Sequence, residues 1–213
     1  MKTDDLINML ASGPDVSAPA MPVQRFVLLV SFGFLASIGM MLTFLGMRPN
    51  LNELIMMPAF WIKIAFVVCL AAVGWVASAR LSTPGTRITM LPLLIALPVL
   101  LIWIVGAISL MHAAPGERAQ LFWGQTWRYC PFLIALLSMP LFVAVLKIMR
   151  NLAPVRLRLA GATAGFAAGA AATMVYSLHC PEIAAPFVGF WYLVGIMIPT
   201  VIGVLIGPRV LRW

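Results

Sequence analysis

The stretch MLPLLIALPVLLIWIVGAISLM, residues 90–111, contains no charged side chain. The hydrocarbon core of a bilayer is about 30 Å thick, and a helix needs about 20 apolar residues to cross it. Other stretches of the chain meet the same length, so we predict an all-α fold, a polytopic bundle of six transmembrane helices. Besides residues 90–111, the predicted crossings are 26–46, 60–80, 130–149, 158–178 and 187–207.

The composition excludes an ordinary soluble domain, because 63% of the residues are hydrophobic and only 9% are charged. The formal net charge of +8 raises the alternative of nucleic-acid binding. The basic residues, however, are scattered at the ends of the predicted helices, which is typical of topology signals. We therefore expect the lipid bilayer as the surroundings and no direct nucleic-acid partner. The N-terminus has no apolar core before residue 26, so we expect no cleavable signal peptide.

The distribution of Lys and Arg predicts the orientation, because cytoplasmic loops carry an excess of them. One side of the predicted membrane domain receives ten basic residues, and the loops on the other side hold three. Both termini are therefore expected in the cytoplasm, with a tail of residues 1–25, a membrane domain of residues 26–207 and a short tail of residues 208–213. The ten are Lys2, Arg25, Arg80, Arg87, Lys147, Arg150, Arg156, Arg158, Arg209 and Arg212, and the three are Arg48, Arg118 and Arg128.

The N-terminal tail carries a short predicted amphipathic helix. Short polar and acidic residues open it, where they cap free amides and suit the helix dipole. Apolar residues follow at helical spacing until Gly13-Pro14 ends the pattern. A helix this short is marginal in water, so it rests either on the membrane surface or against a partner protein. The residues of this candidate partner-binding helix are Thr3, Asp4, Asp5, Leu6, Ile7, Met9 and Leu10.

Two features of the predicted crossings concern packing. Gly161, Gly165 and Gly169 recur every four residues among small side chains, a pattern that lets another helix approach closely. The simplest interpretation of Lys63, near the outer end of the second crossing, is a side chain that snorkels to the interface and pairs with Glu53.

The residues capable of chemistry collect on the predicted outer side. Cys130 opens the fourth crossing, His179, Cys180 and Glu182 follow the fifth, and His112 follows the third. In an oxidising compartment the two thiols can form a disulfide if their Cα atoms come within about 7 Å. The thiols and the two imidazoles are alternatively candidate ligands of Zn²⁺ or Cu⁺. A third interpretation is a static disulfide or two thiols without a sensing role.

The two thiols are expected to differ in reactivity. Pro131 suits the first helical position, which places Cys130 at the N-cap, where the helix dipole favours a thiolate. Cys180 follows the C-terminal end of the fifth crossing, where the dipole opposes one. The sequence therefore predicts that Cys130 is the more reactive thiol.

Short segments spread from one end of the chain to the other carry a resemblance to a known family. They are KTDDLI (2–7), GMRPNL (46–51), FWIK (60–63), HCPE (179–182), the stretch 187–195 with Trp191-Tyr192, and GPRVLRW (207–213). Together they resemble the NrsF-type anti-sigma factors, which are six-span proteins of the bacterial inner membrane.

The resemblance implies a regulator, with no enzymatic activity and no cofactor. Such proteins hold an extracytoplasmic-function sigma factor on the cytoplasmic side and release it when the periplasmic side detects stress. By position, Cys130 and Cys180 would be the sensing pair, with His179 and Glu182 as neighbours. Residues 2–12 would belong to the sigma-binding tail, and cytoplasmic loops 81–89 and 150–157 would help to hold the partner.

Two other functions compete with this one. A membrane thiol-disulfide oxidoreductase would pass electrons between periplasmic cysteines and a quinone, but it needs a second thiol pair within reach. The chain offers one outer pair, and Cys69 is expected to be a small apolar residue buried in the second crossing. A passive membrane scaffold would need neither the thiols nor the N-terminal helix.

Overall fold

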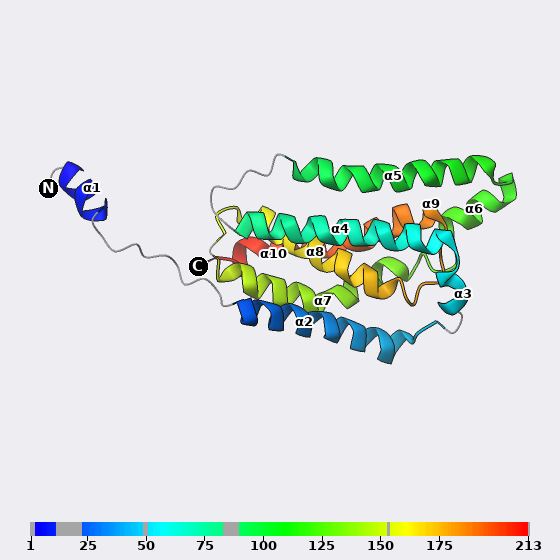
Figure 1. The fold of residues 1–213 in the computed structure, drawn as a ribbon, viewed down its shortest axis with the longest axis horizontal. Helices are drawn as coiled ribbons and strands as arrows, with labels where there is room; N and C mark the ends of the chain where they lie inside the picture. The colour runs from blue at the N-terminus through cyan, green and yellow to red at the C-terminus, as the bar shows by residue number, and fades with distance from the viewer. Residues whose placement is uncertain (1–2, 12–22, 49–50, 83–89, 153, 213) are drawn as a thin grey trace.

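The computed structural model describes residues 3–11, 23–48, 51–82, 90–152 and 154–212, and this part of the chain contains helices and no strand (Figure 1). In chain order the elements are α1 (Thr3–Ala11), α2 (Val23–Met40), the π-helix η1 (Met41–Leu45), α3 (Leu51–Ile55), α4 (Pro58–Ser82), α5 (Leu91–His112), α6 (Pro115–Trp123), α7 (Cys130–Arg150), α8 (Leu157–Tyr176), α9 (Ala185–Phe187), the π-helix η2 (Val188–Tyr192) and α10 (Leu193–Val210).

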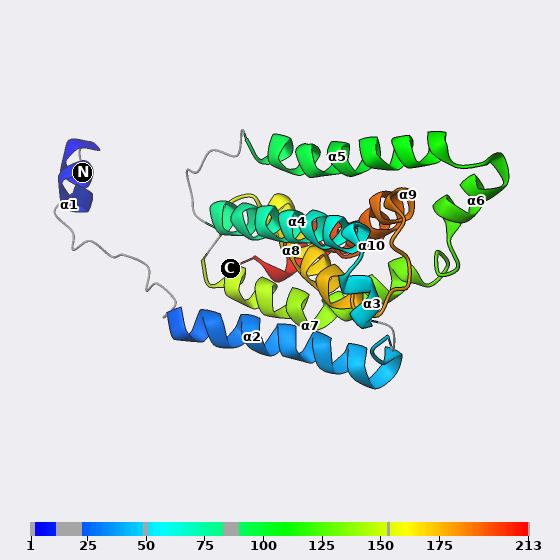
Figure 2. The ribbon, with the colours of Figure 1, turned by 45° about the vertical axis from the view of Figure 1, so that its right-hand side comes forward.

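Six helical segments among the described residues are long and apolar enough to cross a membrane, which confirms the predicted all-α class and the predicted number of membrane-length helices. Successive crossings run in opposite directions, so the connections gather at two ends of the bundle (Figures 1 and 2). One end holds α3, α6 and residues 177–184, and we call it the thiol end. The opposite end holds the starts of α2, α5 and α8 and the last residues of α4, α7 and α10, and we call it the basic end.

Helix α8 forms the centre of the bundle, where it packs against α10, α4 and α7. Glycines permit its close contact with α10. A β-carbon on Gly161 would run into the backbone of Gly203, and one on Gly165 would run into the carbonyl of Pro199. Gly169 faces the same helix one turn further along. The small residues of α8 thus bring two backbones together, as glycine-rich helices do in membranes.

Helix α5 lies at the side of the bundle, where it packs only against α4, α9 and η2 to an appreciable extent (Figures 1 and 2). Most of its apolar side chains are exposed. Near the thiol end, α5 makes two specific contacts. Gly106 packs against Pro186, and the indole N–H of Trp103 donates to the carbonyl of Gly189 at 2.9 Å. Helix α5 is therefore attached through its contact with residues 185–189.

The last membrane-length segment, Ala185–Val210, contains the π-helical turn η2 between α9 and α10. Single π-helical turns are rare and often occur at functional sites. Here the wider turn sends Trp191 into a group of aromatic rings and buries Tyr192 completely. Both residues thereby reach the thiol end.

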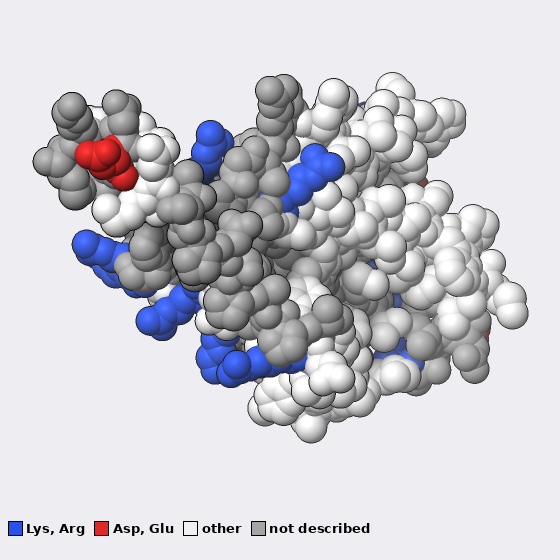
Figure 3. Space-filling model, turned by 60° about the vertical axis from the view of Figure 1, so that its left-hand side comes forward, with Lys and Arg blue, Asp and Glu red and all other residues white. Residues whose placement is uncertain are grey.

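Charge is distributed unevenly between the two ends. The described acidic residues of the bundle, Glu53, Glu117 and Glu182, all lie at the thiol end. Figure 3 shows Lys and Arg gathered at the basic end and one acidic side chain on α1. The exposed basic residues at that end are Arg25, Arg80, Lys147, Arg150, Arg156, Arg158, Arg209 and Arg212.

The predicted N-terminal helix is present as α1. Ile7 and Met9 are 56% and 60% exposed, so apolar surface of this helix is open to a partner. Residues 12–22, which follow it, and residues 83–89 of one predicted cytoplasmic loop lie outside the described part of the chain.

Candidate functional site

The structure brings the two cysteines of the thiol end together. Cys130 is the first residue of α7, and its amide donates to the carbonyl of Thr126 at 2.9 Å. Cys180 closes the end of α8, because its amide donates to the carbonyl of Tyr176 at 2.9 Å. Both side chains are buried, at 0% and 1% exposure, and both thiols are free and interact with each other.

The exact position of Cys130 differs from the prediction. The N-cap of α7 is Tyr129, not Cys130, because the turn formed by residues 126–129 runs directly into the helix. The sulfur of Cys130 is therefore one residue inside the helix, buried against Cys180.

Lys63 is the residue at the site whose role the sequence interpretation missed. Its side chain is 1% exposed, so it does not snorkel to the interface. Its Nζ donates to the carbonyl of Cys180 at 3.1 Å and to that of Glu182 at 3.0 Å. It also lies 5.5 Å from the ring centre of Tyr192. The predicted pairing with Glu53 is wrong, since Glu53 is exposed and Lys63 bonds to backbone carbonyls instead.

The turn at residues 180–182 is held by more than Lys63. The carbonyl of Pro181 accepts a hydrogen bond from Nη1 of Arg48 at 2.9 Å. The Nδ1–H of His179 donates to the carbonyl of Gly46 at 2.9 Å. Two cationic side chains, Arg48 and Lys63, thus bind the three consecutive carbonyls of the Cys-Pro-Glu turn. The hydrogen bond from His179 to Gly46 is a fourth contact between this turn and the segment from α2 to α4.

Glu182 fixes the other wall of the site. Its Oε1 accepts from the backbone N–H of Gln125 at 2.7 Å, across 57 residues of sequence. Gly124, the preceding residue, has φ 55, a backbone conformation that favours glycine. Glu182 therefore attaches the Cys180 turn to the loop that leads into Cys130.

Three hydroxyl groups surround the thiols. Thr126 Oγ1 lies 4.0 Å from the sulfur of Cys180. Tyr176 and Tyr192 are 1% and 0% exposed, and both interact with the thiol pair. The hydroxyl of Tyr192 has no nitrogen or oxygen partner among the described residues. Spacing alone could have indicated Tyr176, because it lies four residues, about one helical turn, before Cys180.

A layer of aromatic side chains covers the thiol end next to this site. Ring centres lie 4.8 to 6.3 Å apart, within the usual range for aromatic pairs. The indole N–H of Trp191 donates to the carbonyl of Phe122 at 3.0 Å, and Arg128 lies over the ring of Trp127. The members of this aromatic layer are Phe122, Trp123, Trp127, Phe190 and Trp191.

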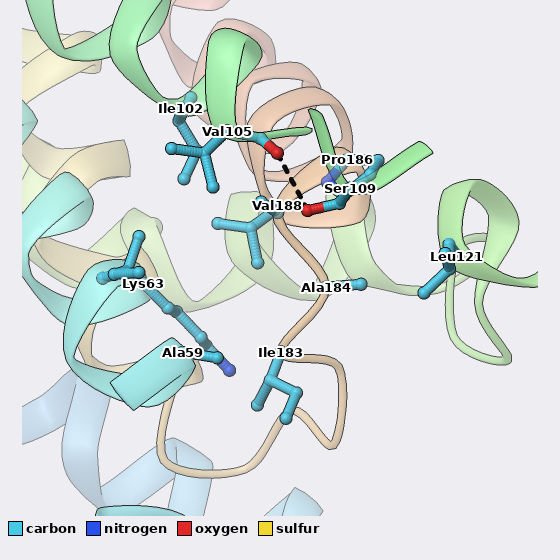
Figure 4. Close-up of a pocket in the computed structure, with 12 residues that line it drawn as sticks. Ala59, Lys63, Ile102, Val105, Ser109, Leu121, Ile183, Ala184, Pro186 and Val188 are labelled. Atoms are coloured by element: carbon cyan, nitrogen blue, oxygen red, sulfur yellow. Dashed lines mark hydrogen bonds between the residues drawn. The ribbon is translucent and has the colours of Figure 1, made fainter. Parts of the chain in front are cut away.

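A cavity of about 330 Å³ lies between α4, α5 and residues 183–188. Figure 4 shows Lys63 beside Ala59 on one side of the cavity and Ser109 on the other side. The hydroxyl of Ser109 donates to the carbonyl of Val105. The remaining walls are almost entirely apolar. The cavity leaves unfilled space beside Lys63 and Ile183, the residue that follows the Cys180–Glu182 turn.

The structure does not assemble the alternative metal site. The described residues contain no group of three or more His, Cys, Asp or Glu side chains arranged to hold a metal. Nδ1 of His112 bonds within its own helix to the carbonyl of Ile108, and its side chain is exposed. His179 is engaged with Gly46. The thiols are the pair that meets, and the two imidazoles do not join them.

The electrostatics favour Cys180 as the more acidic thiol. The hydrogen bond from Cys130 and the positive charge of Lys63 lower the pKa of Cys180 to about 5, against burial, which raises it. The predicted order of reactivity, with Cys130 first, is therefore reversed. A direct hydrogen bond and a nearby full charge together outweigh a helix dipole of roughly half a charge.

Chemically, the site is suited to a change of state and not to electron relay. Two buried, adjacent thiols can be joined or capped, and one of them is activated. Cys69 is exposed on α4, contrary to the expectation that it is buried, and it is not among the groups that act most strongly on the pair. No second thiol pair is within reach of the first.

Comparison with known proteins identifies the family. A family described as negative regulator of sigma F, NrsF, matches residues 10–213, and so covers the whole bundle and the thiol site. The chain belongs to the NrsF family. No solved structure matches the chain.

Two NrsF relatives align over their full lengths and over the full length of this chain. The probable anti-sigma-F factor NrsF of Azospira oryzae is 49% identical over 213 residues. The anti-sigma-F factor NrsF of Caulobacter vibrioides is 33% identical over 225 residues. These alignments include α1, most of which lies before the start of the family match at residue 10.

Proposed function

We propose that this NrsF-family protein is an anti-sigma factor of a bacterial inner membrane. It holds an extracytoplasmic-function sigma factor on the cytoplasmic side and releases it when the Cys130–Cys180 pair is modified from the periplasm. The observation that carries this proposal is the full-length likeness to two proteins named anti-sigma-F factors, one of them 49% identical. The six apolar helices fit a multi-pass membrane protein.

The charge distribution supports the proposed orientation. The exposed Lys and Arg residues gather at the basic end, and the described acids of the bundle lie at the thiol end. A cytoplasmic basic end agrees with the positive-inside rule. The thiol end then faces the periplasm, which is an oxidising compartment.

The buried thiol pair supports the proposed signal. In the oxidative form of this step the two sulfurs join, and the two thiol protons and two electrons pass to hydrogen peroxide, which is reduced to two waters. Capture of the thiols by an electrophile or a soft metal ion is the alternative input. Either event changes the distance and charge between the start of α7 and the end of α8.

Helix α8 is the proposed route from the thiol end to the basic end. It ends four residues before Cys180 and contacts α4, α7 and α10 along its length. Displacement of its end would therefore move helices that reach the basic end. An input can shift such an equilibrium only through its different affinity for the two states.

Helix α1 and the basic end are the proposed sigma-binding surfaces. The helix presents exposed apolar residues, Ile7 and Met9, beside the acidic Asp5. The loop around Arg150 and Arg156 adds exposed positive charge. A helix of nine residues becomes ordered most readily against a partner.

The first experiment is co-purification of a sigma factor with the detergent-extracted protein from its own cell. The intact chain is compared with a chain that lacks residues 2–12 and with Gly116→Ala, a substitution at an open position of α6 at the thiol end. Sigma recovered with the intact chain and Gly116→Ala, but lost with the deletion, supports an anti-sigma factor that binds through α1. Recovery with all three moves the binding surface to the loops. Absence of sigma from every sample contradicts the proposal.

The oxidoreductase alternative makes a different prediction. It requires turnover of the thiols with a quinone, and the described chain offers a single pair with no relay partner. Steady-state oxidation of a dithiol by the purified protein and a soluble quinone would favour it. The scaffold alternative predicts that neither the thiols nor α1 affects any partner.

A further inference from the structure

Lys63 is an unusual cation for a membrane helix. It is 1% exposed, and no carboxylate of the described residues forms an ion pair with it; its two hydrogen bonds go to the carbonyls of Cys180 and Glu182. Burying an ammonium group without a counter-charge is costly. A residue in this setting calls for a nearby group that can become an anion.

Cys180 is the group best placed to supply that negative charge. Lys63 bonds to its backbone carbonyl, and among the acidic groups around Lys63 the Cys180 thiol favours the ammonium charge most. The carboxylate of Glu182 contributes less, and its Oε1 accepts from Gln125. The other titratable or charged groups around the pair are Cys130 of α7, Tyr176 of α8, Tyr192 of η2 and Arg48 before α3.

We propose that Lys63 is the positioning residue of the thiol pair, which holds the Cys180–Glu182 turn through two carbonyls and serves as counter-cation of a Cys180 thiolate. This role deepens the proposed thiol sensing and rests on it for its biological meaning. It depends on two hydrogen bonds, complete burial and the lack of an ion pair with any carboxylate in the described part of the chain.

The arrangement makes Lys63 a link between thiol chemistry and backbone position. Capping the Cys180 sulfur removes its negative charge and leaves the buried ammonium without a counter-ion. The ammonium must then lose its proton or leave, and either change weakens its hold on the two carbonyls. The adjoining cavity of about 330 Å³ gives the released turn room to move toward α5 (Figure 4).

The test is the pH profile of alkylation at Cys180, followed on the full-length protein in detergent with iodoacetamide and peptide mass spectrometry. Replacing Lys63 with Met keeps the length of the side chain and removes the charge. We expect alkylation of Cys180 at pH about 6 to fall by about tenfold or more, and its midpoint to move toward that of an ordinary thiol. Lys63→Arg, which keeps the charge, should retain an acidic midpoint.

Lys147→Met is the matched control, because Lys147 is an exposed lysine at the basic end of α7. It should leave the Cys180 profile unchanged. An unchanged midpoint in a folded Lys63→Met protein, or an equal shift in Lys147→Met, overturns the assignment. Thermal unfolding of each variant verifies that it is folded.

A second measurement needs no variant. Lys63 is buried, so an amine-acetylating reagent should label it slowly in the unmodified protein. After the thiols are capped with N-ethylmaleimide, acetylation of Lys63 should rise severalfold while that of Lys147 stays constant. Unchanged acetylation of Lys63 after capping contradicts the proposed link. Neither measurement involves a sigma factor, so both test the role of Lys63 alone. The anti-sigma proposal is tested separately, by the co-purification experiment.

Discussion

The carboxylate of Glu182 fills the space beside Gly124 that a side chain there would need. A β-carbon built on Gly124 would lie 2.7 Å from Cδ of Glu182, and Gly124 has φ 55. The same carboxylate accepts from the amide of Gln125 at 2.7 Å. One contact thus joins the segment after α8 to the loop before α7, and so joins the backbones that carry Cys180 and Cys130.

We predict that Gly124→Ala destabilises the thiol end. The new β-carbon meets Glu182, and the positive φ adds strain, which together cost about 1–3 kcal/mol. Thermal unfolding in detergent measures this, and alkylation of Cys130 and Cys180 should become faster as the site opens. Gly116→Ala, at an open position of α6, is the control. Equal stability of the two variants would show that the Gly124–Glu182 contact is unimportant.

Close contact between α8 and α10 gives a second prediction. Gly161→Ala places a β-carbon against the backbone of Gly203 and should destabilise the bundle by about 1–3 kcal/mol or more. Gly39→Ala meets nothing within 4 Å and should be neutral or slightly stabilising, because Ala favours helix. Unfolding by denaturing detergent distinguishes them. A Gly161→Ala protein as stable as Gly39→Ala contradicts the packing seen here.

The third prediction concerns signalling. Cys130→Ser and Cys180→Ser should each abolish release of the sigma factor after addition of a peroxide, because neither variant can form the disulfide. Cys69→Ser should respond normally, since Cys69 is exposed on α4 away from the pair. A reporter gene controlled by the sigma factor measures the response. Normal induction in both single variants of the pair would refute thiol sensing.

The fourth prediction is the pH dependence of Cys180 itself. Its pKa is lowered from 9.0 to about 5, and the thiolate is the reactive form. Lowering the pKa of an acid extends its charged form to lower pH. The alkylation rate of Cys180 should therefore rise between about pH 4 and about pH 6 and then level off, whereas that of a free thiol keeps rising toward its own pKa near 9. A Cys180 rate that still climbs steeply above pH 8 is incompatible with the assigned thiolate.

The sequence led to the residues of the site but not to their arrangement. Cys130, Cys180, His179 and Glu182 were all indicated by their positions at the ends of predicted crossings. The residues that contact these four were not indicated by the sequence, because those partners are spread over distant parts of the chain. Lys63 lies 117 residues from Cys180, and the hydrogen bond between them depends on the packing of α4 against α8. Snorkelling is the default for a lysine near a helix end, and only tertiary contacts replace it.

Sequence alone also ranked the two thiols incorrectly. The helix dipole is a local property, so it can be inferred from Pro131 and the start of α7. The groups that lower the pKa of Cys180 are the hydrogen bond from Cys130 first and then the charge of Lys63, and both come from other helices. Likewise, the apolar stretch around Cys69 does not show whether its side chain points into the bundle or away from it. The packing of α4 decides this and leaves Cys69 exposed.

By itself the sequence determined the helical class, the number of crossings and the uneven distribution of charge. These depend on costs that each segment meets separately in a bilayer: unsatisfied backbone groups, and charges that must stay at the interfaces. The tertiary structure alone decided that Cys130 meets Cys180, that Lys63 is buried against their turn, and that His112 stays apart. Those contacts join residues of different helices, and the close approach of α8 to its neighbours fixes which side chains can reach one another.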